Sequence, residues 1–236
     1  MEFILEGLKT ALKLLLRGDK EVLQITLLTF KVCGTATLLS VFIGLPVGLF
    51  LALRDFPGKR FIITIVNTGM GLPPVVVGLW VSILLWRYGP LGFLNLMYTP
   101  TAIIIAQAVI ASPIIMGLSM AAIQQLDPNL RLQLKALGAS KFQLTLLLVS
   151  EARLSLLAAV IAGFGGVVSE VGAAMMVGGN VKGLTRVLTT AISLHVSRGE
   201  FELAIALGLI LMFLSFLITY FLTTVQQRRT YNWKKY

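Results

Sequence analysis

The sequence is poor in the residues from which soluble enzymes build catalytic and metal sites. It has one cysteine, Cys33, and one histidine, His195, among its 236 residues. A single cysteine cannot form a disulfide within the chain, and no cysteine, histidine and carboxylate cluster has the spacing of a metal site. There is no glycine-rich phosphate loop that ends in Lys and Ser or Thr. We therefore expect no metal and no other cofactor in this chain, no nucleotide hydrolysis by it, and a structural or solvated role for His195.

Charge is also scarce. Only 13% of the residues are charged, against about 25% in soluble domains, while 57% are hydrophobic and the mean hydropathy is +0.90. Apolar windows of about 20 residues, long enough to cross a bilayer as helices, recur along the chain. The sequence predicts an all-α, polytopic transmembrane helical bundle with five spans, at residues 24–53, 61–86, 101–124, 154–177 and 201–225.

The N-terminal residues 1–23 carry a charge every three or four positions. They lack the uninterrupted apolar centre and the cleavage site of a signal peptide. Their apolar positions share one helix face and predict an amphipathic helix that either spans the membrane or lies on it. These positions are Ile4, Leu5, Leu8, Leu12 and Leu15. The transmembrane domain then covers residues 24–225, and residues 226–236 form a basic cytoplasmic tail.

The net charge of +10 is spread over short connections, not gathered in one patch with aromatic residues. We therefore expect a lipid bilayer and no nucleic acid as the partner of these charges. Eleven Lys and Arg residues fall in the first loop, the third loop and the tail, and eight fall on the opposite side of the membrane. The positive-inside rule then predicts an outer N-terminus and a cytoplasmic C-terminus.

The third loop, residues 125–153, is the longest cytoplasmic connection. Asp127 and Pro128 are a helix N-cap and a first-turn proline, and two short helices are expected to meet near Gly138. The stripe of Leu130, Leu134 and Leu137 is typical of a helix that lies on the membrane surface or docks on a partner. Periodicity alone leaves both alternatives open.

The stretch "KALGASKFQ" in this loop resembles the cytoplasmic coupling loop of the permease subunits of ABC importers. Gly138, Ala139 and Ser140 match its Gly-Ala-Ser turn, whereas residues 132–134 are Leu-Gln-Leu where the family has Glu-Ala-Ala, and residues 150–151 are Ser-Glu where it has Leu-Pro. The stretches "GLPPVVVGLWVSILLWRYGPLG", "AVIAGFGGVVSEVGAAMMVGGN" and "TRVLTTAISL" resemble the molybdate and tungstate permeases. "MMVGGN" followed by "TRVLTTAI" is most similar to the tungstate type.

The resemblance implies a type I ABC importer permease fold in a prokaryotic inner membrane. It implies a homodimer that sits on two ATPase subunits, which bind ATP and Mg, and that receives an oxyanion from an extracytoplasmic binding protein. Tungstate is the first expectation for this oxyanion, and molybdate or another oxyanion such as sulfate is the alternative. The chain would be a transport subunit working by alternating access, not an enzyme. The ATPase-coupling residues would be Leu130, Leu134, Lys135, Leu137, Gly138, Ala139, Ser140 and Lys141.

Two of the predicted spans contain features that lipid tolerates poorly. In the second span, Pro73 and Pro74 remove two backbone donors and bend the helix, so this segment should face protein and not lipid. In the fourth span, the spacing of Ala158, Ala162, Gly166, Glu170 and Ala174 places a carboxylate on a seam of small residues, with Ala159 and Gly163 beside them.

Glu170 therefore needs a partner inside the protein. One option is an ion pair with Lys31, which lies at a similar depth in the first span, about 10 Å below the outer surface. The other option is to accept backbone hydrogen bonds near the glycines. Both are structural, and a role on the translocation path is the alternative.

Neutral donors are better suited than a carboxylate to reversible contact with an anion. The candidates for the path or gate are Thr185, Thr189, Thr190 and Ser193, and Met175 and Met176 are expected only to line it. A stand-alone secondary transporter or channel is the main competing class, but it would normally show inverted repeats, and none is visible. An intramembrane enzyme would need paired catalytic groups that the chain lacks.

Overall fold

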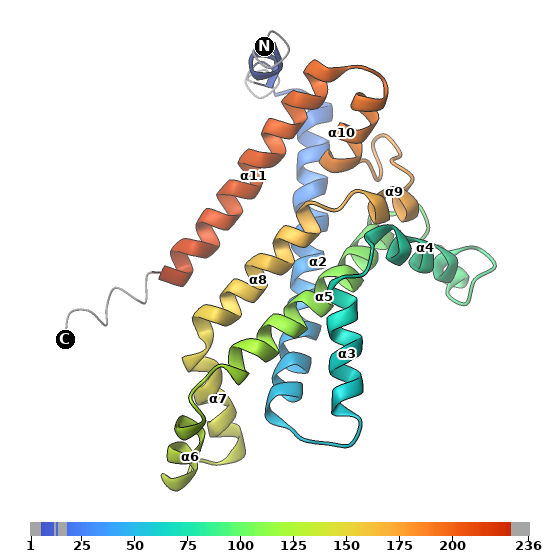
Figure 1. Cartoon of the computed structure of the whole chain (residues 1–236). Coiled ribbons are helices and arrows are strands. Elements are labelled where there is room, and N and C mark those ends of the chain that lie inside the picture. The colour runs from blue at the N-terminus through green and yellow to red at the C-terminus, as the bar shows by residue number, and fades with distance from the viewer. Residues whose placement is uncertain (1–5, 12, 14–17, 228–236) are drawn as a thin grey trace.

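The structure, a computed structural model, describes residues 6–11, 13 and 18–227 (Figure 1). Within that part of the chain every regular element is a helix, as the composition predicts. The elements are α2 (Lys20–Leu53), α3 (Lys59–Met70), α4 (Pro74–Leu85), the short 3-10 helix η1 (Gly92–Leu94), α5 (Pro100–Gln124), α6 (Pro128–Ala136), α7 (Lys141–Glu151), α8 (Arg153–Val168), α9 (Gly172–Gly178), α10 (Leu188–Ser197) and α11 (Phe201–Gln227).

The bundle is organised around α5, which packs against α2, α3, α4, α8 and α9. Three helices, α2, α5 and α11, are each long and apolar enough to cross a membrane. Their bounds agree within a few residues with the spans predicted at 24–53, 101–124 and 201–225. The length of each apolar run sets these helices, because about 20 residues at 1.5 Å per residue cover a hydrocarbon core.

The other two predicted spans are broken. Residues 61–86 form α3 and α4, which meet at an angle of 104°, because Pro73 and Pro74 interrupt the helical hydrogen bonds. The prediction of one continuous helix over 154–177 is wrong, since α8 ends at Val168 and α9 begins at Gly172. A further bend of 69° separates α7 from α8. If each bent pair counts as one span, the described chain has up to five spans.

Close backbone approach holds the two broken regions together. A Cβ at Gly78 of α4 would lie 2.7 Å from the Cα of Ala173 in α9. That distance is shorter than any real Cβ contact, so α4 and α9 can cross this closely only because position 78 has no side chain. The two breaks are therefore neighbours in space, although about 100 residues separate them along the chain.

The N-terminal segment is described only in part. Residues 6–11 are helical, and Gly7 lies so close to α11 that a Cβ there would be 2.5 Å from Cγ2 of Ile205. Leu8 is exposed. The other residues of the predicted apolar stripe, Ile4, Leu5, Leu12 and Leu15, lie outside the described residues. The basic part of the predicted tail, from Arg228 onward, also lies outside them.

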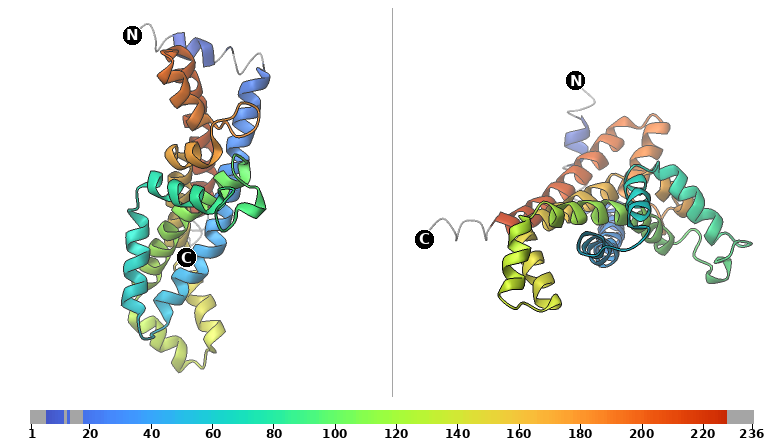
Figure 2. Two further views of the ribbon diagram at one scale, coloured as in Figure 1. Left: turned by 90° about the vertical axis from the view of Figure 1, so that its right-hand side faces the viewer. Right: turned by 60° about the horizontal axis from the view of Figure 1, so that its bottom comes forward.

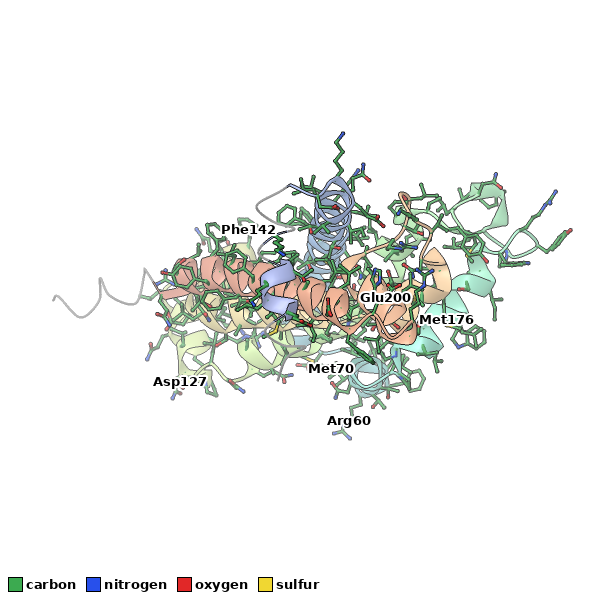
Figure 3. The ribbon with its side chains drawn as sticks, turned by 90° about the horizontal axis from the view of Figure 1, so that it is seen from above. Arg60, Met70, Asp127, Phe142, Met176 and Glu200 are labelled. Atoms are coloured by element: carbon green, nitrogen blue, oxygen red, sulfur yellow. The ribbon has the colours of Figure 1, made fainter. Side chains whose placement is uncertain are left out.

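The two ends of the bundle carry different connections. The turn between α2 and α3 and the α6–α7 pair lie at one end, while the start of α2 and the turn between α10 and α11 lie at the other (Figures 1 and 2). The basic first and third loops therefore share one end. Viewed along the bundle, Arg60 points away from it, and Asp127 and Met176 lie on opposite sides (Figure 3).

Candidate translocation site

The two helix breaks line a common cavity of about 300 Å³. The α3–α4 break contributes residues 69–74, the end of α8 contributes Gly166, and the α8–α9 break contributes Ser169 and Glu170. Ile110 and Ile114 of α5 form its apolar wall. Discontinuous helices that face each other in this way are how membrane transporters place irregular backbone on a path, because such backbone cannot face lipid.

Side chains satisfy the backbone at the α8–α9 break. The Ala173 N–H donates to Oε1 of Glu170 at 2.7 Å, so the carboxylate caps the start of α9. The Thr189 hydroxyl donates to the Glu170 carbonyl at 3.0 Å, and Nε2 of Gln107 donates to the Val167 carbonyl at 3.4 Å. The break is therefore a fixed structure in which side chains replace the missing helical bonds.

Glu170 is 5% exposed and holds the break together. Of the two structural options, the backbone hydrogen bond is present, and the ion pair with Lys31 is absent among the described residues. The pairing fails because Glu170 is not on α8. The break turns the carboxylate toward α9, whereas Lys31 lies on an exposed face of α2.

The predicted seam of small residues is present only in part. Ala158 and Ala162 are exposed, and the buried positions are the neighbouring Ala159 and Gly163. A Cβ at Gly163 would lie 2.6 Å from Cγ1 of Ile115, so the contact between α8 and α5 depends on this glycine. Within α8 the packing face is therefore formed by Ala159 and Gly163, whereas Glu170 and Ala174 of the predicted row are buried at and beyond the break.

The three threonines predicted as anion donors already make hydrogen bonds within the protein. Thr185 donates to the Gly178 carbonyl at 2.6 Å and accepts from the Val181 N–H, and Thr190 donates to the Val187 carbonyl at 3.0 Å. Thr189 is bonded to Glu170 as described above, and all three side chains are buried. In this conformation these hydroxyls hold the segment around α9 and α10, and only Ser193 of the four is exposed.

The two methionines lie on α9 beside the first break. Met175 is exposed, and Met176 is half-buried close to Gly78 of α4. Figure 3 shows Met176 on the side of the molecule away from the α6–α7 pair. The Met176 thioether packs near Gly78 of α4, neither thioether suits a hard oxyanion as a ligand, and the lining role of both residues stays a prediction.

The loop at residues 125–153 forms two helices, as its capping pattern predicts. Asp127 accepts from the Asn129 N–H at 2.8 Å to cap α6, and Ser140 forms a reciprocal capping box with Gln143 at the start of α7. Gly138 has a φ of +81°, in the left-handed region that favours glycine. The turn between the helices is therefore encoded locally.

The three leucines of the apolar stripe in this loop differ in burial. Leu130 and Leu134 are half-buried and pack against a cluster that contains Leu144 and Leu148, so only part of each side chain is open to a partner, and their role in coupling stays a prediction. Leu137 is 84% exposed and Phe142 is 77% exposed, and both lie near the turn. The exposed apolar tip is thus Leu137 and Phe142, while Leu130 and Leu134 fix the loop to the bundle.

Basic residues surround this tip. Arg54, Arg131, Lys135 and Lys141 line a cavity of about 370 Å³ together with Phe142. Nη2 of Arg131 donates to the Leu53 carbonyl at 3.1 Å, which ties α6 to the end of α2. Nearby, a hydrogen bond and the charge of Lys59 lower the pKa of Asp55. The surface at this end is therefore cationic with an apolar centre.

The comparison with known families decides the class of the chain. Residues 44–231, which include both helix breaks and the α6–α7 loop, match the family described as the binding-protein-dependent transport system inner membrane component. The chain belongs to this family. It is an inner-membrane permease subunit, not an enzyme, and the family works with ATPase and binding-protein partners.

Individual relatives of this permease agree with that assignment. It is 41% identical over 227 residues to the tungstate uptake system permease protein TupB of Peptoclostridium acidaminophilum, which covers 96% of this chain and 100% of that one. It is 37% identical over 220 residues to the protein of the same name from Campylobacter jejuni, which covers 93% and 92%. Both alignments take in almost the whole chain.

A solved structure confirms the fold. The permease superposes on a chain of the inward-facing MetNI methionine ABC transporter with a TM-score of 0.72 and 22% identity, covering 89% of this chain and 96% of that one. The predicted type I importer permease fold is therefore present. At this identity the likeness concerns the fold alone.

Sequence reasoning missed two features of the permease. Gln107 is an amide inside the apolar run "IIIAQAVIA", and such an isolated polar residue in a span is a usable signal of an internal role. It is almost fully buried and bonds the end of α8. Phe142 was missed because a single exposed aromatic next to a basic residue has no period, so only the packing of α6 against α7 reveals it.

Proposed function

We propose that this permease is the membrane-spanning subunit of an ATP-driven tungstate importer. Tungstate is proposed as the substrate because the chain is 41% and 37% identical, over nearly its full length, to two bacterial tungstate uptake permeases. Molybdate has the same tetrahedral geometry and charge and is the main competitor, and sulfate is a more distant one. ATP and Mg are bound by the partner ATPase, and this chain holds no cofactor.

The permease works as a homodimer by alternating access. The support is the α3–α4 break, where Gly71, Leu72 and Pro73 are exposed on the single chain. Interrupted backbone cannot face hydrocarbon, so this surface requires a second copy or a water-filled path. A two-fold axis beside this break would place both cavities of a dimer next to one central path.

The α6–α7 end faces the cytoplasm, and the N-terminus is outside. The support is the concentration of Lys and Arg in the two loops at that end. Each permease then presents Leu137 and Phe142 to one of two ATPase subunits. A short helix pair fixed to the bundle by Leu130 and Leu134 transmits movement of the ATPase as a rigid body. The extracytoplasmic binding protein delivers the oxyanion at the opposite end.

Uptake by a reconstituted complex tests the proposal. The permease, its ATPase and its binding protein are placed in proteoliposomes, and tungstate accumulation is measured with ATP, without ATP, and with each component left out. We expect accumulation only with all three proteins and ATP. Excess molybdate should compete with tungstate more strongly than excess sulfate. Accumulation by the permease alone would contradict the importer assignment, and uptake of sulfate in preference to tungstate would contradict the substrate.

A further inference from the structure

A third cavity, of about 610 Å³, lies at the end of the bundle where α2 begins. It is bounded by α2 and by the segment between α9 and α10. Four cations line it, Lys20, Lys31, Lys182 and Arg186, and Glu21 is its one acidic residue. Its lining therefore has a formal excess of three positive charges. None of these residues belongs to the helix-break cavity described above.

The α2 wall of this cavity is a single helix face. Lys20, Gln24, Leu27 and Lys31 are spaced by four, three and four residues and all line the cavity. At about 1.5 Å per residue, Lys31 lies about 17 Å further along the helix axis than Lys20. The cations thus follow the helix from its first residue to a point well inside the membrane-spanning segment.

The opposite wall is held rigidly. The Arg186 side chain is 13% exposed, and its Nε donates to Oδ1 of Asn180 at 3.3 Å. Its Nη1 donates to Oε1 of Glu21 at 3.4 Å, while Nζ of Lys182 lies 2.6 Å from Oε2 of the same carboxylate. The Glu21 carboxylate therefore pairs with both Arg186 and Lys182. Their combined charge is only partly neutralised.

The two lysines of α2 have no such partner. Neither Lys20 nor Lys31 makes an ion pair with any described residue, and the side of α2 that carries Lys31 is open to the cavity. An unpaired cation at the depth of Lys31 is costly in hydrocarbon, so the cavity has to hold water or an anion. An anion would relieve the repulsion among the cations as well.

We propose that this cavity, the outer vestibule, receives the divalent oxyanion before it reaches the helix-break cavity. The inference rests on the proposed function and names a site for its substrate. Cations that converge on a walled cavity raise the local concentration of an anion and speed its capture. Lysine ammonium groups act as point charges without a fixed geometry, which suits contact that must be released again.

Charge removal at Lys31 tests the vestibule in the complete reconstituted complex. We compare Lys31→Gln, Lys31→Arg and Lys182→Gln with Arg198→Gln, which removes a cation from the same end of the bundle but outside the cavity. At subsaturating tungstate, Lys31→Gln and Lys182→Gln should each slow uptake about five- to tenfold. Lys31→Arg should retain most of the activity, and Arg198→Gln should stay close to the unmodified protein. Higher salt should narrow the difference.

Three results would overturn the proposal. The first is unchanged uptake in the Lys31→Gln, Lys182→Gln double variant. The second is weaker docking of the binding protein in proportion to the loss of uptake, which would assign the cations to a protein contact. The third is a defect confined to vesicles with anionic phosphatidylglycerol and absent from phosphatidylcholine, which would assign them to lipid headgroups.

Failure of the proposed function is distinguished from failure of the vestibule. If the unmodified complex accumulates none of tungstate, molybdate and sulfate, the importer assignment fails. The vestibule is then judged by equilibrium binding of the three oxyanions to the permease–ATPase complex without the binding protein. There, Lys31→Gln must weaken binding about fivefold while Lys31→Arg does not. Equal binding by both variants would reject the site.

Discussion

A buried carboxylate in a membrane protein has to be paired, neutralised or hydrogen-bonded. Glu170 is hydrogen-bonded, because its Oε1 accepts the Ala173 N–H in the first turn of α9. Its backbone carbonyl in turn accepts from Thr189 of α10. One residue therefore joins the end of α8, the start of α9 and the start of α10. These bonds give Glu170 a structural role at the helix-break cavity and do not require it to bind an anion.

Two substitutions, Glu170→Gln and Glu170→Ala, distinguish the effect of the hydrogen bond that caps α9 from the effect of the negative charge. Glu170→Gln keeps an oxygen acceptor for the Ala173 N–H, so we expect normal assembly and a nearly unchanged melting temperature. Glu170→Ala removes the acceptor and should destabilise the protein by about 1–2 kcal/mol, the usual cost of a lost cap. Thermal unfolding in detergent measures both. Ser193→Ala, at an exposed hydroxyl of α10, is the control. Normal assembly of Glu170→Gln with a changed oxyanion preference would favour a role on the path instead.

Among the single helices, two local features are important: a close helix crossing at a glycine, and exposed apolar side chains near a turn. The contact between α4 and α9 brings the two breaks together, and the α6–α7 pair presents its tip at one end of the bundle. Both depend on small features of short helices. The helices α4, α6, α7 and α9 are each too short to cross a membrane, so packing against the long helices determines their positions.

A methyl group at the α4–α9 crossing should separate these helices. Gly78→Ala places a Cβ 2.7 Å from the Cα of Ala173, and backbone cannot yield at that distance without moving the helix. Gly34→Ala makes the same change in the middle of α2, where a Cβ would meet nothing within 4 Å. We expect Gly78→Ala to lower the melting temperature by several degrees and to reduce uptake, and Gly34→Ala to leave both unchanged. Equal behaviour of the two variants would contradict the crossing.

The leucines of the α6–α7 pair should differ in effect according to the side they face. Leu137→Ser changes a side chain that is 84% exposed, so the permease should remain stable but retain less ATPase on co-purification. Leu134→Ser introduces a hydroxyl into the packed cluster and should instead lower the melting temperature of the permease itself. Pull-down and thermal unfolding are measured on both variants. Loss of stability in Leu137→Ser would argue against its role as a docking tip.

At the scale of the whole molecule, the bundle separates two charged ends. The vestibule cations surround the start of α2, and the cations around Phe142 surround the α6–α7 tip. The helix-break cavity is lined by neither set. Under the proposed function, an anion would meet favourable fields at both ends, and the helix-break cavity would add one carboxylate that is already hydrogen-bonded to backbone.

Cysteine labelling tests the orientation of these ends. Cys33, the one cysteine in the sequence, is buried, so its background labelling should be low. In intact cells, a membrane-impermeant maleimide should label Arg198→Cys and should label Lys135→Cys only after the membrane is opened. The unmodified protein is the control. The reverse pattern would place the α6–α7 tip outside and would exclude it as the ATPase contact.

The amino-acid sequence was enough to predict the class of the protein, the three long helices and the two helices of the loop at residues 125–153. Length and apolarity decide a spanning helix, and the caps at Asp127 and Ser140 and the turn at Gly138 act within a few residues. The Pro73–Pro74 bend is local in the same way. Motif spacing across residues 138–140 and around "MMVGGN" was enough to predict the permease family and its fold.

Tertiary structure decided where the fourth span breaks and which side chains face outward. The partners that make the break stable, Gln107 and Thr189, lie about 60 and 20 residues away from it in the chain. No helical period contains that information, and so the predicted row included the exposed Ala158 and Ala162, and the sequence left the Lys31 pair open beside the backbone hydrogen bond that is observed. Likewise, Leu130 and Leu137 are alike in sequence, and only the packing of α6 on α7 makes one an anchor and the other a tip. The position of the break and the burial of these side chains depend on the free energy of contacts between segments that are far apart in the chain.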